Sequence, residues 1–146
     1  MHSVREILEA KNRPAVVCVD PLQSVYEAIQ LMDEKHVGAV LVMVDGYLMG
    51  ILSERDFVRR SIVDHKMSKQ IKVCEAMTHD PVTVNEQDSF VHCLALMREK
   101  HIRHLPVVRQ GKAVGMISLR DLFVDALHEP YEEPERRPPQ KENATR

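Results

Sequence analysis

The sequence contains the same pattern twice, at an offset of about 65 residues and without a gap between Val17 and Leu127. A duplication of this kind predicts two similar units that bury their apolar faces together. The chain is therefore expected to fold as two related halves. The matching pairs include Ser24 with Ser89, Leu31-Met32 with Leu96-Met97, Glu34-Lys35-His36 with Glu99-Lys100-His101, Gly46 with Gly111, Gly50 with Gly115, and Ser53, Arg55 and Asp56 with Ser118, Arg120 and Asp121.

Each copy is predicted to fold as β-α-β-β-α, which places the chain in the α+β class. Short apolar runs predict the first strands. A favoured N-cap residue, Ser24 or Ser89, then precedes apolar residues at helical spacing, so a core-facing helix is expected after each. The pairs Asp45-Gly46 and Gln110-Gly111 predict tight hairpin turns. The expected elements are strands at 15–19 and 82–84, strands at 39–44 and 105–108 before the turns, and closing helices at 54–62 and 119–127.

The same pattern predicts the domain organisation. The two repeats are expected to be joined by a linker whose polar, basic part, 65–72, lies on the surface. The last segment is rich in proline and charge and has no apolar period, so we expect it to be disordered. The predicted boundaries are a helical lead-in at 1–14, repeats at 15–62 and 77–128, the linker at 63–76 and the tail at 129–146.

Composition narrows the function classes. Aromatic residues are only 4% of the chain and tryptophan is absent, so the stacking platforms of single-strand nucleic-acid binders are missing. A formal net charge of -2 gives no general attraction to nucleic acids or anionic membranes, so any phosphate site has to be local. No signal peptide and no long apolar run is present, and the cysteines follow no disulfide or zinc pattern. A cytoplasmic protein is expected.

A Gly-x-x-Ser-x-x-Asp motif stands in both copies where the third strand should meet the last helix, at Gly50–Asp56 and at Gly115–Asp121. With the tandem β-α-β-β-α order and the stretch His104–Val108, the chain resembles the cystathionine-β-synthase (CBS) domain family over about 110 residues. The resemblance implies two repeats packed with pseudo-two-fold symmetry. It also implies two clefts, which in different members bind AMP, ADP, ATP, NAD or S-adenosylmethionine. The free-standing bacterial type, which the chain resembles, commonly forms a homodimer.

The motif suits nucleotide binding for physical reasons as well. A serine between a strand and a helix start places backbone N–H groups and a hydroxyl at the positive end of a helix dipole. By resemblance, Asp56 and Asp121 accept hydrogen bonds from ribose hydroxyls. Gly50 and Gly115 are expected to leave room for a base, beside Met116 in the second copy, and Arg55 and Arg120 to reach phosphates. The structural alternative is a capping box, in which Ser53 or Ser118 and the aspartate three residues later only satisfy backbone N–H groups.

The resemblance also groups residues across the two copies and predicts unequal clefts. Ser118 and Asp121 are grouped with Val37 and Gly38, and Ser53 and Asp56 with Ile102 and Arg103. Gly38 aligns with Arg103, and Ala39 with His104. Arg103, Arg120 and His104 therefore form a local basic set suited to phosphate, or, alternatively, solvated charges at a strand edge. Leu41 stands where the second copy has Pro106, and it permits an extra ladder hydrogen bond in the first copy.

The sequence carries no catalytic or phosphate-loop motif, so no enzyme and no catalytic cofactor is expected. His36, His101 and His104 lack the acidic or thiol neighbours of a metal site and are read as helix ends and strand starts. The expected function is a sensor that binds AMP, ADP, ATP or NAD, with S-adenosylmethionine less favoured. Its predicted partners are a second copy and an unidentified downstream protein, with no nucleic acid and no membrane. A ligand-free dimeric scaffold is the alternative.

Overall fold

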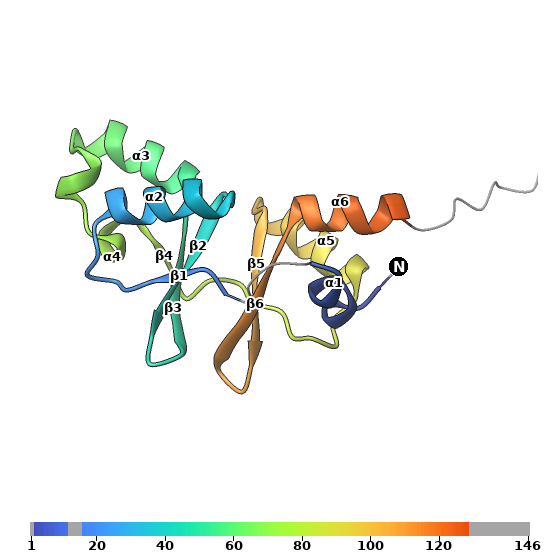
Figure 1. The fold of residues 1–146 in the computed structure, drawn as a ribbon. Coiled ribbons are helices and arrows are strands. Elements are labelled where there is room, and N and C mark those ends of the chain that lie inside the picture. Colours follow the sequence, from blue (N-terminus) through green and yellow to red (C-terminus); the bar gives the residue numbers. More distant parts are fainter. Residues whose placement is uncertain (1, 12–15, 129–146) are drawn as a thin grey trace, which may run out of the picture.

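The computed structural model describes residues 2–11 and 16–128, which form two similar halves side by side (Figure 1). Each half has a β-hairpin with a pair of helices above it, α2 and α3 in one half and α5 and α6 in the other (Figure 1). The predicted tail, 129–146, lies outside the described residues. The elements are α1 Val4–Ala10, β1 Cys18–Val19, α2 Val25–Lys35, β2 Ala39–Val44, β3 Tyr47–Ser53, α3 Glu54–Asp64, the 3-10 turn η1 Ser68–Gln70, α4 Val73–Ala76, β4 Thr78–His79, α5 Phe90–Lys100, β5 His104–Arg109, β6 Lys112–Ser118 and α6 Leu119–His128.

The two long core helices begin as the sequence predicts. The Ser24 hydroxyl accepts a hydrogen bond from the Glu27 N–H, and the Ser89 hydroxyl accepts one from the His92 N–H. Such N-caps satisfy backbone donors that an isolated helix start leaves unpaired. Both helices bury an apolar stripe: Val25, Ala28 and Met32 in α2, and Phe90, Cys93 and Met97 in α5. The prediction of core-facing helices is confirmed.

The two hairpins also follow their turn residues. Asp45 and Gly46 have φ angles of 52° and 82°, and Gln110 and Gly111 have 51° and 78°. Two successive positive φ angles match the twist of antiparallel strands, and glycine adopts the second of them without steric cost. The predicted tight turns between β2 and β3 and between β5 and β6 are confirmed.

The strands form one sheet in the order β1-β2-β3-β6-β5, with β4 paired to β3. The two halves of this sheet are joined by one residue pair, Tyr47 with Lys112, at the hairpin tips. There the Lys112 Nζ lies 5.7 Å from the centre of the Tyr47 ring, a cation–π arrangement. Strand pairing between the halves is therefore small.

The first strand differs between the halves, and Leu41 and Pro106 explain the difference. The Leu41 N–H donates a 3.0 Å hydrogen bond to the Val17 carbonyl oxygen, which helps to hold β1 beside β2. Pro106 has no N–H to donate, and the predicted strand at 82–84 is reduced to a single bridge between Val84 and Val107. The extra ladder bond in the first copy is confirmed, and the strand at 82–84 is corrected.

Each half has its own apolar core, and each core includes a helix from outside the predicted repeat. Val4 and Ile7 of α1 are buried in the core of the second half. Ile71 and Val73, from the predicted linker, are 2% and 0% exposed in the core of the first half. The expectation of a surface segment through 65–72 is therefore wrong at Ile71, because an apolar residue there completes the core.

The helices α1 and α4 dock in equivalent ways on opposite halves. Each leads its own repeat in the sequence and packs on the other repeat. The shared pattern is a pair of backbone hydrogen bonds that tie the helix to the start of α2 or α5. These are Val73 N–H to Gln23 O and Val25 N–H to Ile71 O on one side, and Val4 N–H to Asp88 O and Phe90 N–H to His2 O on the other. This exchange gives the two halves their pseudo-two-fold relation.

Gly50 and Gly115 do not present an open face to a base. A β-carbon on Gly50 would lie 2.6 Å from the Met77 Sδ and 2.7 Å from the Thr78 carbonyl oxygen. A β-carbon on Gly115 would lie 2.9 Å from the Leu8 Cδ2. The expectation that these glycines accommodate a base is corrected, because the chain's own segments occupy both places.

These contacts predict unequal effects for matched substitutions. Gly50→Ala should lower the free energy of unfolding by about 1–3 kcal/mol, because the Thr78 backbone has to move. Gly115→Ala should cost less than about 1 kcal/mol, because only the end of the flexible Leu8 side chain is crowded. Urea unfolding of both variants measures the difference, and equal losses would contradict this account of packing.

Candidate functional site

The two Ser-x-x-Asp corners form complete capping boxes. The Ser53 N–H donates to the Asp56 Oδ2 at 2.9 Å, and the Asp56 N–H donates to the Ser53 Oγ at 3.2 Å. The equivalent distances between Ser118 and Asp121 are 2.7 and 3.2 Å. The predicted capping hydrogen bonds are therefore present at both corners. These contacts use only the Oδ2 atom of each carboxylate, so capping does not prevent the Oδ1 atom from accepting bonds from a ligand.

Each corner is tied to the residue that precedes the middle strand of its own half. The Leu119 N–H donates to the Arg103 carbonyl oxygen at 2.8 Å, and the Glu54 N–H donates to the Gly38 carbonyl oxygen at 3.1 Å. The start of α6 is thus held against the start of β5, and the start of α3 against the start of β2. This arrangement fixes where the two aspartates point.

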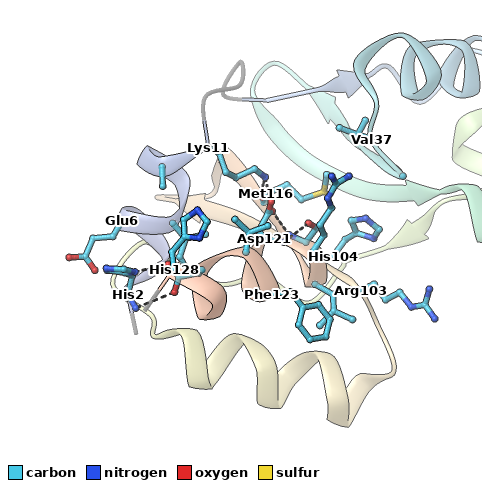
Figure 2. A pocket seen from close by; sticks show the side chains of 18 of the residues that line it. His2, Glu6, Lys11, Val37, Arg103, His104, Met116, Asp121, Phe123 and His128 are labelled. Carbon is cyan, nitrogen blue, oxygen red and sulfur yellow. Dashed lines mark hydrogen bonds and ion pairs between the residues drawn. The ribbon is translucent and has the colours of Figure 1, made fainter. Parts of the chain in front are cut away.

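A cavity of about 910 Å³ lies around the Asp121 corner, between the two halves and α1. It brings Ser118 and Asp121 together with Val37 and Gly38 of the other half, as the sequence grouping predicts. Figure 2 shows several of the lining side chains, including Asp121, His104 and Met116. The predicted site residues that line it are Val37, Gly38, Arg103, His104, Met116, Ser118, Arg120 and Asp121.

The other predicted site residues lie elsewhere. They are Gly50, Ser53, Arg55, Asp56 and Ile102, and they line neither this cavity nor the one beside it. The sequence motifs do not predict one wall of the cavity, which α1, its flanking residues and the later turns of α6 provide. That wall includes His2, Glu6, Glu9, Lys11, Phe123, Val124, Asp125 and His128.

Lys11, at the end of α1, lies inside this site. Its Nζ is 2.8 Å from the Asp121 Oδ2 and 2.8 Å from the Met116 carbonyl oxygen (Figure 2). Nothing in the motif points to Lys11, which is far from Asp121 in the sequence. One signal was available: Val4-x-Glu6 before the first repeat matches Val73-x-Glu75 before the second, and marks two equivalent helices.

A second cavity of about 800 Å³ adjoins the first. Its apolar lining comes from Val17, Val37, Val114 and Met116, and its charged lining includes Arg5, Lys35 and Arg109. The residues common to both cavities are Glu9, Lys11, His36, Val37 and Met116. The two cavities therefore meet around Lys11.

His104 lies between the two corners. Burial lowers the pKa of His104, and this effect outweighs the nearby Asp121 carboxylate, which raises it. Weaker contributions come from Lys11 and Arg103, which lower the pKa, and from Asp56, which raises it. The ring occupies the space beside Gly38, where a β-carbon would lie 3.7 Å from the His104 Nε2. The His104 imidazole is therefore neutral at pH 7, although the carboxylates of Asp121 and Asp56 both act on it.

The basic residues around the cavities are not equally available to a ligand. Glu86 is largely buried and accepts two short hydrogen bonds from the Arg109 Nη2, at 2.6 and 2.7 Å. Hydrogen bonding from Arg109 holds the pKa of the Glu86 carboxyl below its usual range, despite burial. Within the part of the chain that the structure describes, Arg103 and Arg120 form no ion pair. The first cavity, around the Asp121 corner, therefore contains two arginines without an acidic partner among the described residues.

Two further expectations concern metals and membranes. Among residues 2–11 and 16–128, no group of three or more His, Cys, Asp or Glu side chains is arranged to hold a metal ion. No helix within those ranges combines the length and the apolar character needed to span a bilayer.

Known proteins share this architecture. The CBS domain family model matches residues 4–62 and 72–125, so it includes α1 in the first repeat and α4 in the second. The mitochondrial CBS domain-containing protein CBSX3 of Arabidopsis thaliana is 36% identical over 143 residues, which cover 92% of this chain and 69% of that protein.

Solved structures agree with the family match. The CBS domain NE2398 is 40% identical, with a TM-score of 0.81, and the match covers 86% of this chain and 98% of that one. CBSX2, solved in complex with AMP, is 26% identical with a TM-score of 0.72, over 87% of this chain and 97% of that one. The described fold, the paired capping boxes and these matches together show that the chain belongs to the CBS domain family, as a tandem pair of CBS repeats.

Proposed function

We propose that the protein is a regulatory module that binds an adenine nucleotide at the Asp121 corner and passes the resulting conformational change to another protein. The cavity of about 910 Å³ carries this proposal, because it joins a carboxylate, a helix N-terminus and two arginines without an acidic partner. Its volume is within the usual range for small-molecule sites, about 300–1,000 Å³. The AMP complex of CBSX2 supports the same ligand class.

Each part of a nucleotide has a counterpart in this site. The Asp121 carboxylate suits the paired ribose hydroxyls, since ionised acceptors form the stronger hydrogen bonds. Arg103 and Arg120 suit phosphate oxygens, which guanidinium groups bind in a bidentate manner. Val37 and Met116 offer an apolar surface for the base, and both extend into the second cavity.

The proposed ligands are AMP, ADP, ATP and NAD. The two arginines without an acidic partner favour ligands with phosphate over S-adenosylmethionine, which carries a sulfonium charge. In this proposal the protein acts in the cytoplasm as a binding module rather than as an enzyme. The Asp56 corner, which lacks an equivalent of His104, is a separate site with a different preference.

We also propose that a second copy of the chain covers an apolar surface formed by α3 and α6. Ile62 and Leu127, at equivalent positions of the two repeats, are 67% and 81% exposed. Val58 and Phe123, one turn earlier in each helix, are also exposed. Paired apolar faces of this kind are typical of association surfaces.

A ligand-free dimeric scaffold is the second candidate function. The observation that favours it is the Lys11–Asp121 ion pair, which already occupies the Oδ2 atom of the carboxylate that a ribose would use. Ligand binding separates the two candidates.

The first prediction tests the site with a matched pair of variants. AMP should raise the melting temperature of the native protein, because a ligand at 100 times its dissociation constant stabilises by about 2.7 kcal/mol. Asp121→Ala should remove this shift at the Asp121 corner. Asp56→Ala loses an equivalent capping box, which costs about 1 kcal/mol, but should keep binding at Asp121. Thermal melts and calorimetric titration measure both effects.

The outcomes are distinct. If AMP, ADP, ATP and NAD at millimolar concentration leave the native melting temperature unchanged, the scaffold replaces the sensor. If both aspartate variants bind AMP as the native protein does, the two carboxylates serve only as helix caps.

The second prediction concerns pH. Because burial lowers the pKa of His104, the free site holds a neutral imidazole at pH 7, and a nearby phosphate would favour its protonation. AMP binding should therefore take up protons, and the dissociation constant should fall as pH decreases from about 8 to about 6. Calorimetry in two buffers with different ionisation enthalpies measures the uptake.

His104→Gln should remove most of this proton uptake, whereas His36→Gln, in the same cavity, should keep it. Titration of the AMP phosphate itself is common to all three proteins, so the difference isolates His104. Equal uptake by the native protein and by His104→Gln would show that another group takes the proton.

The third prediction concerns association. Light scattering should give the native protein twice the chain mass of 16.8 kDa. The double variant Ile62→Asp, Leu127→Asp should be monomeric, because two charges would be buried in the contact. Val91→Asp, an exposed apolar position on α5, is the control and should remain dimeric. A native mass of one chain would rule out the proposed dimer.

A further inference from the structure

The contact between Lys11 and Asp121 is the main feature that the proposed function leaves unexplained. The two side chains are 23% and 16% exposed, so the ion pair is well shielded from water. Lys11 also donates to the Met116 carbonyl oxygen, which places its ammonium group between β6 and the start of α6. A ribose whose two hydroxyls bind both oxygens of the Asp121 carboxylate has to alter this contact, because Lys11 holds the Oδ2 atom.

Lys11 also lies where the two cavities meet. It lines both of them, together with Val37 and Met116 from opposite halves. A nucleotide with its ribose at Asp121 and its base toward the second cavity would pass beside this ammonium group. The lysine therefore lies beside the ribose, and its flexible side chain can turn from Asp121 toward the phosphate.

This lysine is special to one side of the molecule. Leu8 packs on Gly115 as Met77 packs on Gly50, so the two contacts are equivalent. Three residues beyond them stand Lys11 on one side and Asp80 on the other. The chain remains helical through Ala10 on the first side, whereas on the second it leaves α4 and forms β4. The segment that leads the second repeat therefore has an acidic residue at the sequence position equivalent to Lys11.

The other acidic side chains around the first cavity are poorly placed to receive Lys11. Glu6 accepts a 2.7 Å hydrogen bond from the Ser3 N–H, and the Asp125 carboxylate is paired with the His2 ring. Glu9 is exposed on α1, where water screens its charge. If a ribose takes both oxygens of the Asp121 carboxylate, the ammonium group loses its shielded partner.

Resting on the proposed function, we propose that Lys11 is a specificity-determining residue that makes the Asp121 site select nucleotides over nucleosides. A phosphate supplies a new anionic partner for the displaced ammonium group, so the exchange retains a charge-assisted hydrogen bond. An uncharged nucleoside binds the carboxylate but has no phosphate to pair with Lys11. The partly buried ammonium group is then left unpaired. Selection of nucleotides over nucleosides thus depends on whether the ligand supplies an anionic partner for Lys11.

The test compares AMP with adenosine on three proteins. The native protein should bind AMP more tightly than adenosine. Lys11→Met should bind adenosine about tenfold more tightly than the native protein does, and AMP no more tightly, because the competitor and the phosphate partner are lost together. The ratio of the two dissociation constants should therefore fall by about tenfold or more. Calorimetric titration at fixed ionic strength measures each constant.

Lys35→Met is the matched control. Lys35 lines the second cavity and has the same formal charge as Lys11, but its side chain is exposed. The ion pair of Asp121 is with Lys11 and not with Lys35. This variant should keep the native ratio. If Lys35→Met changes the ratio as much as Lys11→Met does, general charge explains the selectivity and the role of Lys11 is wrong.

Other outcomes separate the two proposals. If the native protein binds AMP but Lys11→Met keeps the native ratio, the selectivity role is overturned and the proposed function stands. If the native protein binds neither ligand, the proposed function fails, and the role of Lys11 with it. Should Lys11→Met fail to fold, Lys11→Gln, which retains a donor for the Met116 carbonyl oxygen, gives the same comparison.

Discussion

The reciprocal docking of α1 and α4 is the interaction on which the rest of the structure depends. The sheets of the two halves meet at a single residue pair, so strand pairing alone holds them weakly. Each core is instead completed by a helix that leads the other repeat, with Ile7 of α1 buried on one side and Val73 of α4 on the other. Because these helices cross between the halves, they fix the relation of β2 to β6 and so create the cavity beside Asp121.

The same docking makes the two corners unequal. Both begin with an identical capping box, and from the motif alone they are equivalent. The difference comes from the crossing segments, since α1 stays helical and brings Lys11 to Asp121, whereas the other segment turns into β4. His104 adds to the difference, because it occupies space that Gly38 leaves open. A duplicated motif thus carries two sites whose chemistry is set by residues outside it.

Features that depend on interactions between residues close together in the sequence could be predicted, whereas features that depend on distant residues could not. Serine caps and the turn at Asp45-Gly46 act within a few residues, so they could be predicted. The missing N–H of Pro106 could be predicted to remove a ladder hydrogen bond. Its consequence, the loss of a strand at 82–84, depends on how that segment pairs with β5. The sequence does not predict the burial of Ile71, because Met67 and Ile71 in an otherwise polar stretch form no apolar period. Its burial depends on a core that forms from distant residues.

The sequence by itself determined the duplication, the α+β class, the start of each helix and the presence of an acidic residue in each capping box. These features depend on local propensity and on repeated spacing, which a single chain displays directly. Only the tertiary structure decided that Gly50 and Gly115 are covered by the chain's own segments and that Lys11 reaches Asp121. Those contacts join residues far apart in the chain, and their geometry is set by how the crossing helices pack on the two cores.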